Sequence, residues 1–174
     1  MLEVKPMLEL SVPKVHIPRW SELPNIDLYM DQVLNYMNET IPETFRPVLE
    51  EPCITKTMIN NYVKHEIMAA PVKKKYTRLH IAELFVITFL KQVYTISDIQ
   101  KLIRLALDTS PEDIAYNHFC DVLENSFVST FSGEEYTTSQ DLTEEQYLMK
   151  NVAQSFLNKL YVYYHYLKKD NGNS

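Results

Sequence analysis

The sequence predicts a mainly α-helical protein. Only two of the 174 residues are glycine, 45% are apolar, and apolar residues recur every three or four positions over several long segments. This spacing places apolar side chains on one face of a helix. Few glycines together with twelve tyrosines indicate a packed chain rather than a disordered one. We expect an N-terminal arm at 1–26, a first helical domain at 27–107 and a helical region at 108–174.

The arm is expected to be non-helical, because Pro6, Pro13, Pro18 and Pro24 interrupt it. Trp20 should anchor the arm to the body, since an indole ring gains much from burial.

The first helix is predicted over residues 27–38, with Asp27 as its N-cap. Pro42 ends this segment, and residues 42–53 are predicted to form an acidic loop with further prolines. An acidic loop should lie away from any phosphate that the chain binds.

The second helix is predicted to begin after Thr55 or Thr57, either of which can cap it. Met58, Ile59, Tyr62 and Val63 form its apolar side. The opposite side carries Lys56, Thr57, Asn60, Asn61 and Lys64. Asn is a poor helix former but bonds adenine edges in the major groove, and Lys and Thr reach phosphates.

Charge is concentrated in the same part of the chain. Residues 54–80 carry one acid, Glu66, against the six bases Lys56, Lys64, Lys73, Lys74, Lys75 and Arg78, whereas the whole chain has a net charge of −6. A basic stretch on an acidic protein gives a directed field, and nucleic acid is the commonest polyanion that such a stretch meets. A solvated lysine loop is the alternative explanation.

The order of elements around the lysines is that of a winged helix-turn-helix. Pro71 stops the second helix, and residues 72–76 are predicted to be a short wing. A helix capped by Thr77 follows and is apolar on most of its circumference through Val93, so it should be central to the core. A further helix is predicted to begin at Thr95 or Ser97 and to run through Leu105.

Five segments of this stretch resemble the DNA-binding domain of the MerR family. They are residues 60–62 (NNY), 67–71 (IMAAP), 74–77 (KKYT), 84–87 (LFVI) and 93–99 (VYTISDI). The resemblance covers roughly residues 54–103 and implies a winged helix-turn-helix that binds DNA. MerR-like wings carry glycine, whereas this chain has none between Met1 and Ser132.

A closer resemblance is to an uncharacterised bacterial family, the domain of unknown function numbered eighteen thirty-six. It is carried by Trp20 and by residues 23–24 (LP), 27–32 (DLYMDQ), 57–64 (TMINNYVK) and 90–93 (LKQV). It spans most of residues 16–105 and implies a fold without an established activity.

Two long helices are predicted in the C-terminal region. Ser110, Pro111 and the acids that follow start a helix to about Phe131, and Thr143 with Gln146 forms a capping box for the last helix. An apolar seam runs along that last helix at Met149, Val152, Phe156, Leu160, Tyr163 and Leu167. Packing against the helix at 112–131 and homodimerisation both account for the seam, and the two are compatible.

Enzymatic chemistry is not expected. The histidines at 16, 65, 80, 118 and 165 are scattered, and no nucleophile elbow, HExxH or phosphate-binding glycine loop is present. We therefore expect no catalytic residues, no cofactor and no metal site. Cys53 and Cys120 lie far apart and no signal peptide or membrane span is evident, which favours a cytoplasmic protein with reduced thiols.

Two functions therefore stand as hypotheses. In the first, the chain is a transcriptional regulator that binds double-stranded DNA as a monomer or homodimer, and its C-terminal region dimerises or senses an unknown small-molecule effector. Residues 54–65, including Thr55, Lys56, Thr57, Asn60, Asn61, Tyr62 and Lys64, then enter the major groove. Lys73, Lys74, Lys75, Tyr76 and Arg78 hold phosphates. In the second, the chain is a protein-interaction module whose basic face docks an acidic partner.

Overall fold

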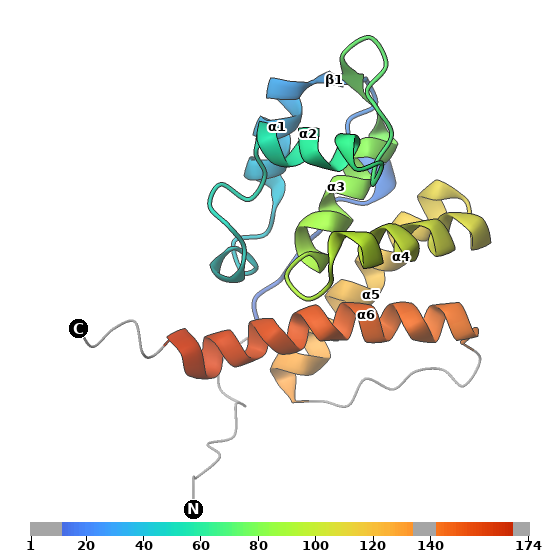
Figure 1. Ribbon diagram of the computed structural model, residues 1–174. Coiled ribbons are helices and arrows are strands. Elements are labelled where there is room, and N and C mark those ends of the chain that lie inside the picture. Colours follow the sequence, from blue (N-terminus) through green and yellow to red (C-terminus); the bar gives the residue numbers. More distant parts are fainter. Residues whose placement is uncertain (1–11, 134–141, 169–174) are drawn as a thin grey trace, which may run out of the picture.

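The structure, a computed structural model, describes residues 12–133 and 142–168 and is mainly helical (Figure 1). The predicted features at 1–11, in most of the 132–141 loop and beyond Lys168 lie outside these residues. The helices are α1 (Met30–Thr40), α2 (Lys56–Lys64), α3 (Arg78–Leu90), α4 (Ile96–Thr109), α5 (Glu112–Ser132) and α6 (Glu144–Val162), which continues as a π-helical turn over Tyr163–Leu167. Two short strands, β1 (Leu28–Tyr29) and β2 (Lys75–Tyr76), pair antiparallel.

The first helix begins later than the sequence predicts. Leu28 pairs with Tyr76 and Tyr29 pairs with Lys75, so these residues are extended and the helix starts at Met30. Its N-cap is Tyr29, whose N–H donates to Oε1 of Gln32 at 2.9 Å, and Asp27 does not cap it. The pairing of β1 with β2 is a contact distant in sequence, which local capping patterns do not reveal.

Other helix starts agree with the sequence. Thr55, Thr95 and Thr143 each accept a hydrogen bond from a backbone N–H in the first turn of α2, α4 and α6. The start of α5 differs by one residue: Ser110 is extended and ends α4, Pro111 is the N-cap and Glu112 is the first helical residue.

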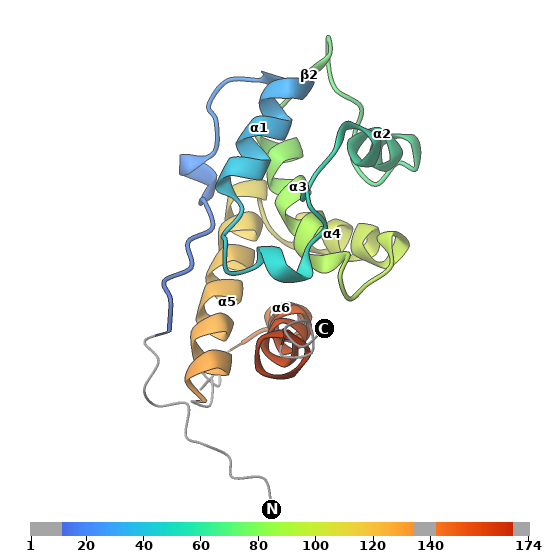
Figure 2. The same ribbon diagram turned by 90° about the vertical axis from the view of Figure 1, so that its left-hand side faces the viewer.

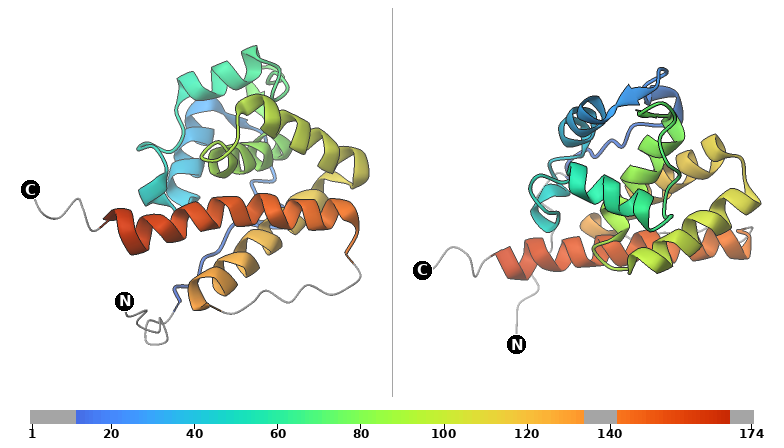
Figure 3. Two further views of the ribbon diagram at one scale, coloured as in Figure 1. Left: turned by 60° about the horizontal axis from the view of Figure 1, so that its bottom comes forward. Right: turned by 45° about the horizontal axis from the view of Figure 1, so that its top comes forward.

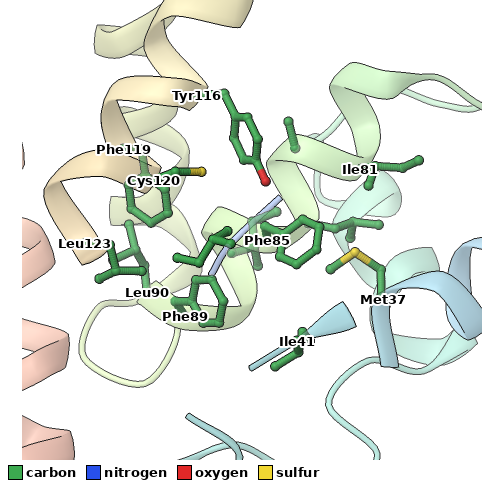
Figure 4. Close-up of a cluster of buried hydrophobic side chains, with 14 of the residues drawn as sticks. Met37, Ile41, Ile81, Phe85, Phe89, Leu90, Tyr116, Phe119, Cys120 and Leu123 are labelled. Atoms are coloured by element: carbon green, nitrogen blue, oxygen red, sulfur yellow. The ribbon is translucent and has the colours of Figure 1, made fainter. Parts of the chain in front are cut away.

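Helix α3 is the centre of the molecule, as its apolar sequence predicts. Nine of its thirteen residues are buried. Figure 4 shows its phenylalanines between side chains of α5 and side chains of α1. The labelled residues include Phe85 and Phe89 of α3, Phe119 and Leu123 of α5, and Met37 and Ile41 of α1. Phe45 lies in the loop that the sequence predicts to be acidic, but its side chain is fully buried. Its ring centroid lies 5.4 Å from that of Phe89 and 5.3 Å from that of Phe156.

Ion pairs and hydrogen bonds attach the N-terminal arm to α5. The guanidinium of Arg19 bonds Glu124 at 2.7 Å and Asp121 at 2.8 Å, and the Glu124 carboxylate also accepts from the N–H of Ile17. Trp20 packs against the core as predicted, with its ring edge-on to Tyr116 at 6.4 Å. The hydrophobic anchor was evident in sequence, whereas the Arg19 pair was not.

Helix α6 lies across the base of the molecule beside α5 (Figures 2 and 3). Buried residues on both sides of position 107 belong to a single hydrophobic cluster that runs from Ile17 to Leu160. Helix α2 and the loop before β2 lie at the opposite end, away from α6 (Figure 1). No helix within the described ranges is long and apolar enough to cross a membrane.

Candidate nucleic-acid interface

Helix α2 has one buried and one exposed side. Ile59 and Tyr62 face the core, and the Thr55 hydroxyl accepts from the N–H of Met58 at 3.2 Å, which fixes the start of the helix. The polar residues predicted for the outer side are all exposed; they are Lys56, Thr57, Asn60, Asn61 and Lys64. This face contains no acid, so it presents amides, a hydroxyl and ammonium groups to solvent.

A two-residue hairpin follows α2. Val72 and Lys75 exchange backbone hydrogen bonds of 3.1 and 2.9 Å, and Lys73 and Lys74 form the exposed tip. Both tip residues have positive φ, 49° and 64°. Positive φ at both central positions is the geometry of a type I′ turn, which favours Asn-Gly because L side chains crowd the backbone there. Lysines thus occupy the turn where glycine is expected.

Buried side chains hold the hairpin against α3. Tyr76 is buried, and the N–H of Thr77 donates to Nδ1 of His80 at 2.9 Å. Because Nδ1 is then an acceptor, Nε2 carries the proton and donates to the carbonyl of Ala69 at 3.0 Å. Burial lowers the pKa of His80, which favours this neutral ring. His80 therefore joins the start of α3 to the segment that connects α2 with the hairpin.

Some predicted contact residues are not on the accessible surface. Tyr62 is 6% exposed and Tyr76 is 4% exposed, because both rings complete the core beneath α2 and the hairpin. Burial raises the pKa of Tyr62 to about 12. Arg78 is partly covered: its Nε donates to the carbonyl of Pro24 at 3.3 Å and its guanidinium lies 5.7 Å from the Trp20 ring. The available basic surface is therefore the outer face of α2 with Lys73 and Lys74.

Lys75 occupies an intermediate position between this surface and the core. Its ammonium group lies 5.1 Å from the ring centroid of Tyr29, a cation–π contact across the β1–β2 pair.

The acids of the 42–53 loop form ion pairs within the chain. Glu50 pairs with Lys91 at 3.6 Å, and Glu43 and Glu51 pair with Arg46. Their charge is partly compensated within the loop and its neighbours.

The apolar seam of α6 is largely used within the chain. Val152, Phe156 and Leu160 are buried in the shared core, and the Phe156 ring lies 5.7 Å from that of Phe89. These three residues are therefore unavailable to a second copy, and packing within the chain is the alternative that accounts for them. Tyr163 and Leu167 lie in the π-helical turn, where Leu167 is 49% exposed.

Glu83 is a chemically distinctive residue that no sequence motif singles out. Glu83 of α3 lines two cavities beside α4, and burial raises the pKa of its carboxyl to about 7. The signal in sequence is a single acid within an otherwise apolar helix, RLHIAELFVITFL. Among the described residues, no group of three or more His, Cys, Asp or Glu is placed to hold a metal ion.

Comparison with known families gives one match. The profile of the family described as Domain of unknown function (DUF1836) matches residues 18–122, more than half of the chain. The chain belongs to this family. The match includes the arm from Pro18, α2, the hairpin, α3, α4 and the first half of α5, and so confirms the closer of the two resemblances. No curated protein and no solved structure matches the chain significantly.

Proposed function

We propose that this member of the family is a DNA-binding transcriptional regulator built as a winged helix-turn-helix, in which α2 enters the major groove and the hairpin at residues 72–75 contacts phosphates. The observation that carries the proposal is an acid-free, exposed polar face on α2 beside a hairpin tipped by two exposed lysines. Figures 1 and 2 show the hairpin rising beside α2, with both at the end of the molecule away from α6.

The outer face of α2 has the chemistry that base recognition requires. Asn60 and Asn61 are exposed, and an Asn amide can both donate to and accept from the adenine edge in the major groove. A helix about 10–12 Å across fits that groove, which is about 12 Å wide. Lys56 and Lys64 stand at the two ends of α2, where they would reach the phosphates that border the groove.

The hairpin supports the proposal through its strain. A non-glycine residue in the left-handed region costs about 1–2 kcal/mol, and this turn contains two of them in succession. Asn-Gly would form the same turn more easily. Two lysines at these positions are explained if their ammonium groups have a polyanion to bind.

The decisive variant is Lys73→Asn with Lys74→Gly, which removes two charges from the tip and suits the turn. We expect it to unfold at higher temperature than the wild type and to bind every duplex more weakly. Each phosphate contact contributes about −0.9 to the slope of log K against log salt. The slope should therefore become shallower by about two in fluorescence-anisotropy titrations across a salt series.

The matched control is Lys14→Ala with Lys168→Ala, which removes two exposed lysines from the arm and the far end of α6. It should leave the slope nearly unchanged.

Asn60→Ala should instead change the preference among sequences in a duplex selection, by about 1–3 kcal/mol at one base pair. Symmetry in the selected motif would report whether two copies bind together. A wild-type protein that binds no duplex at low salt would contradict the proposal and favour an acidic protein as the partner.

A further inference from the structure

One side of α3 carries side chains that the core does not fully bury. Leu79, Glu83 and Val86 are only partly buried, while the residues between them are buried. They are spaced at i, i+4 and i+7, so they lie on one side of the helix. This side faces α4 and α5, where it lines a narrow apolar slot of about 50 Å³ together with Leu102 and Phe119.

A wider cavity adjoins the slot between α3 and α4. It has a volume of about 500 Å³, opens to solvent and is lined by the end of α2, residues 66–70, α3 and α4. Its apolar lining includes Val63, Met68 and Leu107. Glu83 lines both the slot and the cavity, as do Ile103 and Leu107 of α4, so the two spaces adjoin at these residues.

Glu83 is the one acid on the mostly apolar helix α3. Within the described residues its carboxylate makes no hydrogen bond and no ion pair, although apolar side chains partly bury it. Burying an acid without a partner costs stability. Burial and, to a lesser extent, the nearby carboxylate of Glu112 together raise its pKa to about 7. A carboxylate that lowers the stability of the protein in this way and lies in a cavity is a candidate for ligand binding.

The other charged groups around the two spaces leave an excess of negative charge. Glu66 and Arg104 line the wide cavity, and Glu112 lines the slot. The side-chain amide of Gln100 is already occupied, because it donates to the carbonyl of Glu66 at 2.6 Å. The linings of the slot and the cavity together thus hold three carboxylates and one guanidinium, a balance that favours a cationic ligand over an anionic one.

We propose that the cavity beside α4 binds a small organic cation with an apolar body, whose positive group lies against the carboxylate of Glu83. The wide cavity falls within the range of about 300–1,000 Å³ that is typical of small-molecule sites, and the adjoining slot accepts an apolar substituent. This binding does not depend on DNA binding. Its regulatory consequence rests on the proposed function: the site touches Val63 and residues 66–70, so a ligand there would bias the position of α2 and the hairpin.

Two probes of similar shape and opposite fixed charge test the proposal. Benzyltrimethylammonium carries a permanent positive head and phenylmethanesulfonate a permanent negative one. In isothermal titration of the full chain without DNA at pH 8, we expect saturable binding of the ammonium probe with one site per chain, and no binding of the sulfonate. Glu83→Gln should weaken ammonium binding at least tenfold. Glu39→Gln, the same change on the exposed side of α1, should have no effect.

The pH dependence provides a second readout. The ammonium probe does not titrate, so its apparent affinity follows the ionised fraction of Glu83. That fraction rises from about one tenth at pH 6 to about nine tenths at pH 8, which predicts a roughly tenfold gain in affinity. The Glu83→Gln protein should show no such gain. Absence of saturable ammonium binding, equal binding of both probes, or an unaffected Glu83→Gln protein would each overturn the proposal, whatever the outcome of the duplex experiments.

Discussion

Helices α3 and α4 are neighbours of nearly equal length, but they are held very differently. Nine of the thirteen residues of α3 are buried, whereas only Ile99 is buried among the fourteen of α4. Helix α3 contacts α1, β2, α4, α5 and α6, and α4 packs mainly on α3 and α5. Cavities adjoin α4 on both sides. The comparison indicates that α3 is the rigid support of the hairpin, while α4 can shift at little cost in packing.

The largest expected difference between the two helices is in stability. Phe89→Ala should lower the free energy of unfolding by about 3–5 kcal/mol, because it leaves a cavity among packed aromatic rings. Phe45, Phe85 and Phe156 all lie within 6.3 Å of the Phe89 ring, centroid to centroid. Leu105→Ala in α4, where the side chain is 38% exposed, should cost less than about 1 kcal/mol. Equal losses in urea unfolding would remove the distinction between the helices.

The next largest effect concerns the one acid on α3. The pKa of Glu83 is about 7 in the folded chain against an ordinary value of 4.5. The folded state therefore holds the proton more tightly, and the stability contributed by this group is present below pH 4.5 and lost as pH rises through 7. Glu83→Gln abolishes that loss. It should stabilise the protein above pH 7 by at most about 3 kcal/mol.

Thermal unfolding across pH 4 to 8 measures this effect. The difference between the Glu83→Gln protein and the wild type should be small at pH 4 and should grow between pH 5 and 7. Glu39→Gln, which changes an exposed acid, should track the wild type throughout. A Glu83→Gln protein that is less stable at pH 8 would show that the carboxylate has an internal partner and would weaken the case for a ligand.

The sequence predicted those features that depend on neighbouring residues. Helix α3 is apolar almost all round, so its central position followed from periodicity alone, and Thr55, Thr95 and Thr143 cap helices because the cap and its donor lie within three residues. The exposed side of α2 followed in the same way. The burial of Tyr62 and Tyr76 could not be predicted in this way, because tyrosine occurs both in cores and at interfaces. Only the packing of distant segments decides between the two.

The features that were missed all join distant parts of the chain. Phe45 lies in a proline-rich loop but completes a ring cluster with α3 and α6, and Arg19 meets Asp121 and Glu124 about a hundred positions away. The seam of α6 was visible, but whether its partner was the same chain or a second copy depended on tertiary packing. Glu83 is visible in the sequence as an acid in an apolar helix. Its proposed role in binding a ligand depends on cavities, which no local sequence pattern describes.

The smallest effect tests the loose attachment of α4 directly. The Thr95 hydroxyl accepts from the N–H of Asp98 at 3.2 Å, and the Thr143 hydroxyl accepts from the N–H of Gln146 at the same distance. Removing either cap costs about 0.5–2 kcal/mol in its own helix. Because α6 is part of the core, Thr143→Ala should reduce global stability by about that amount. Thr95→Ala should instead speed hydrogen exchange of the α4 amides while leaving those of α3 protected, since a weakly packed helix opens without unfolding the rest. If the Thr95→Ala protein exchanged faster in α3 and α4 alike, α4 would belong to the same cooperative unit as the core, and a ligand beside it would have little to displace.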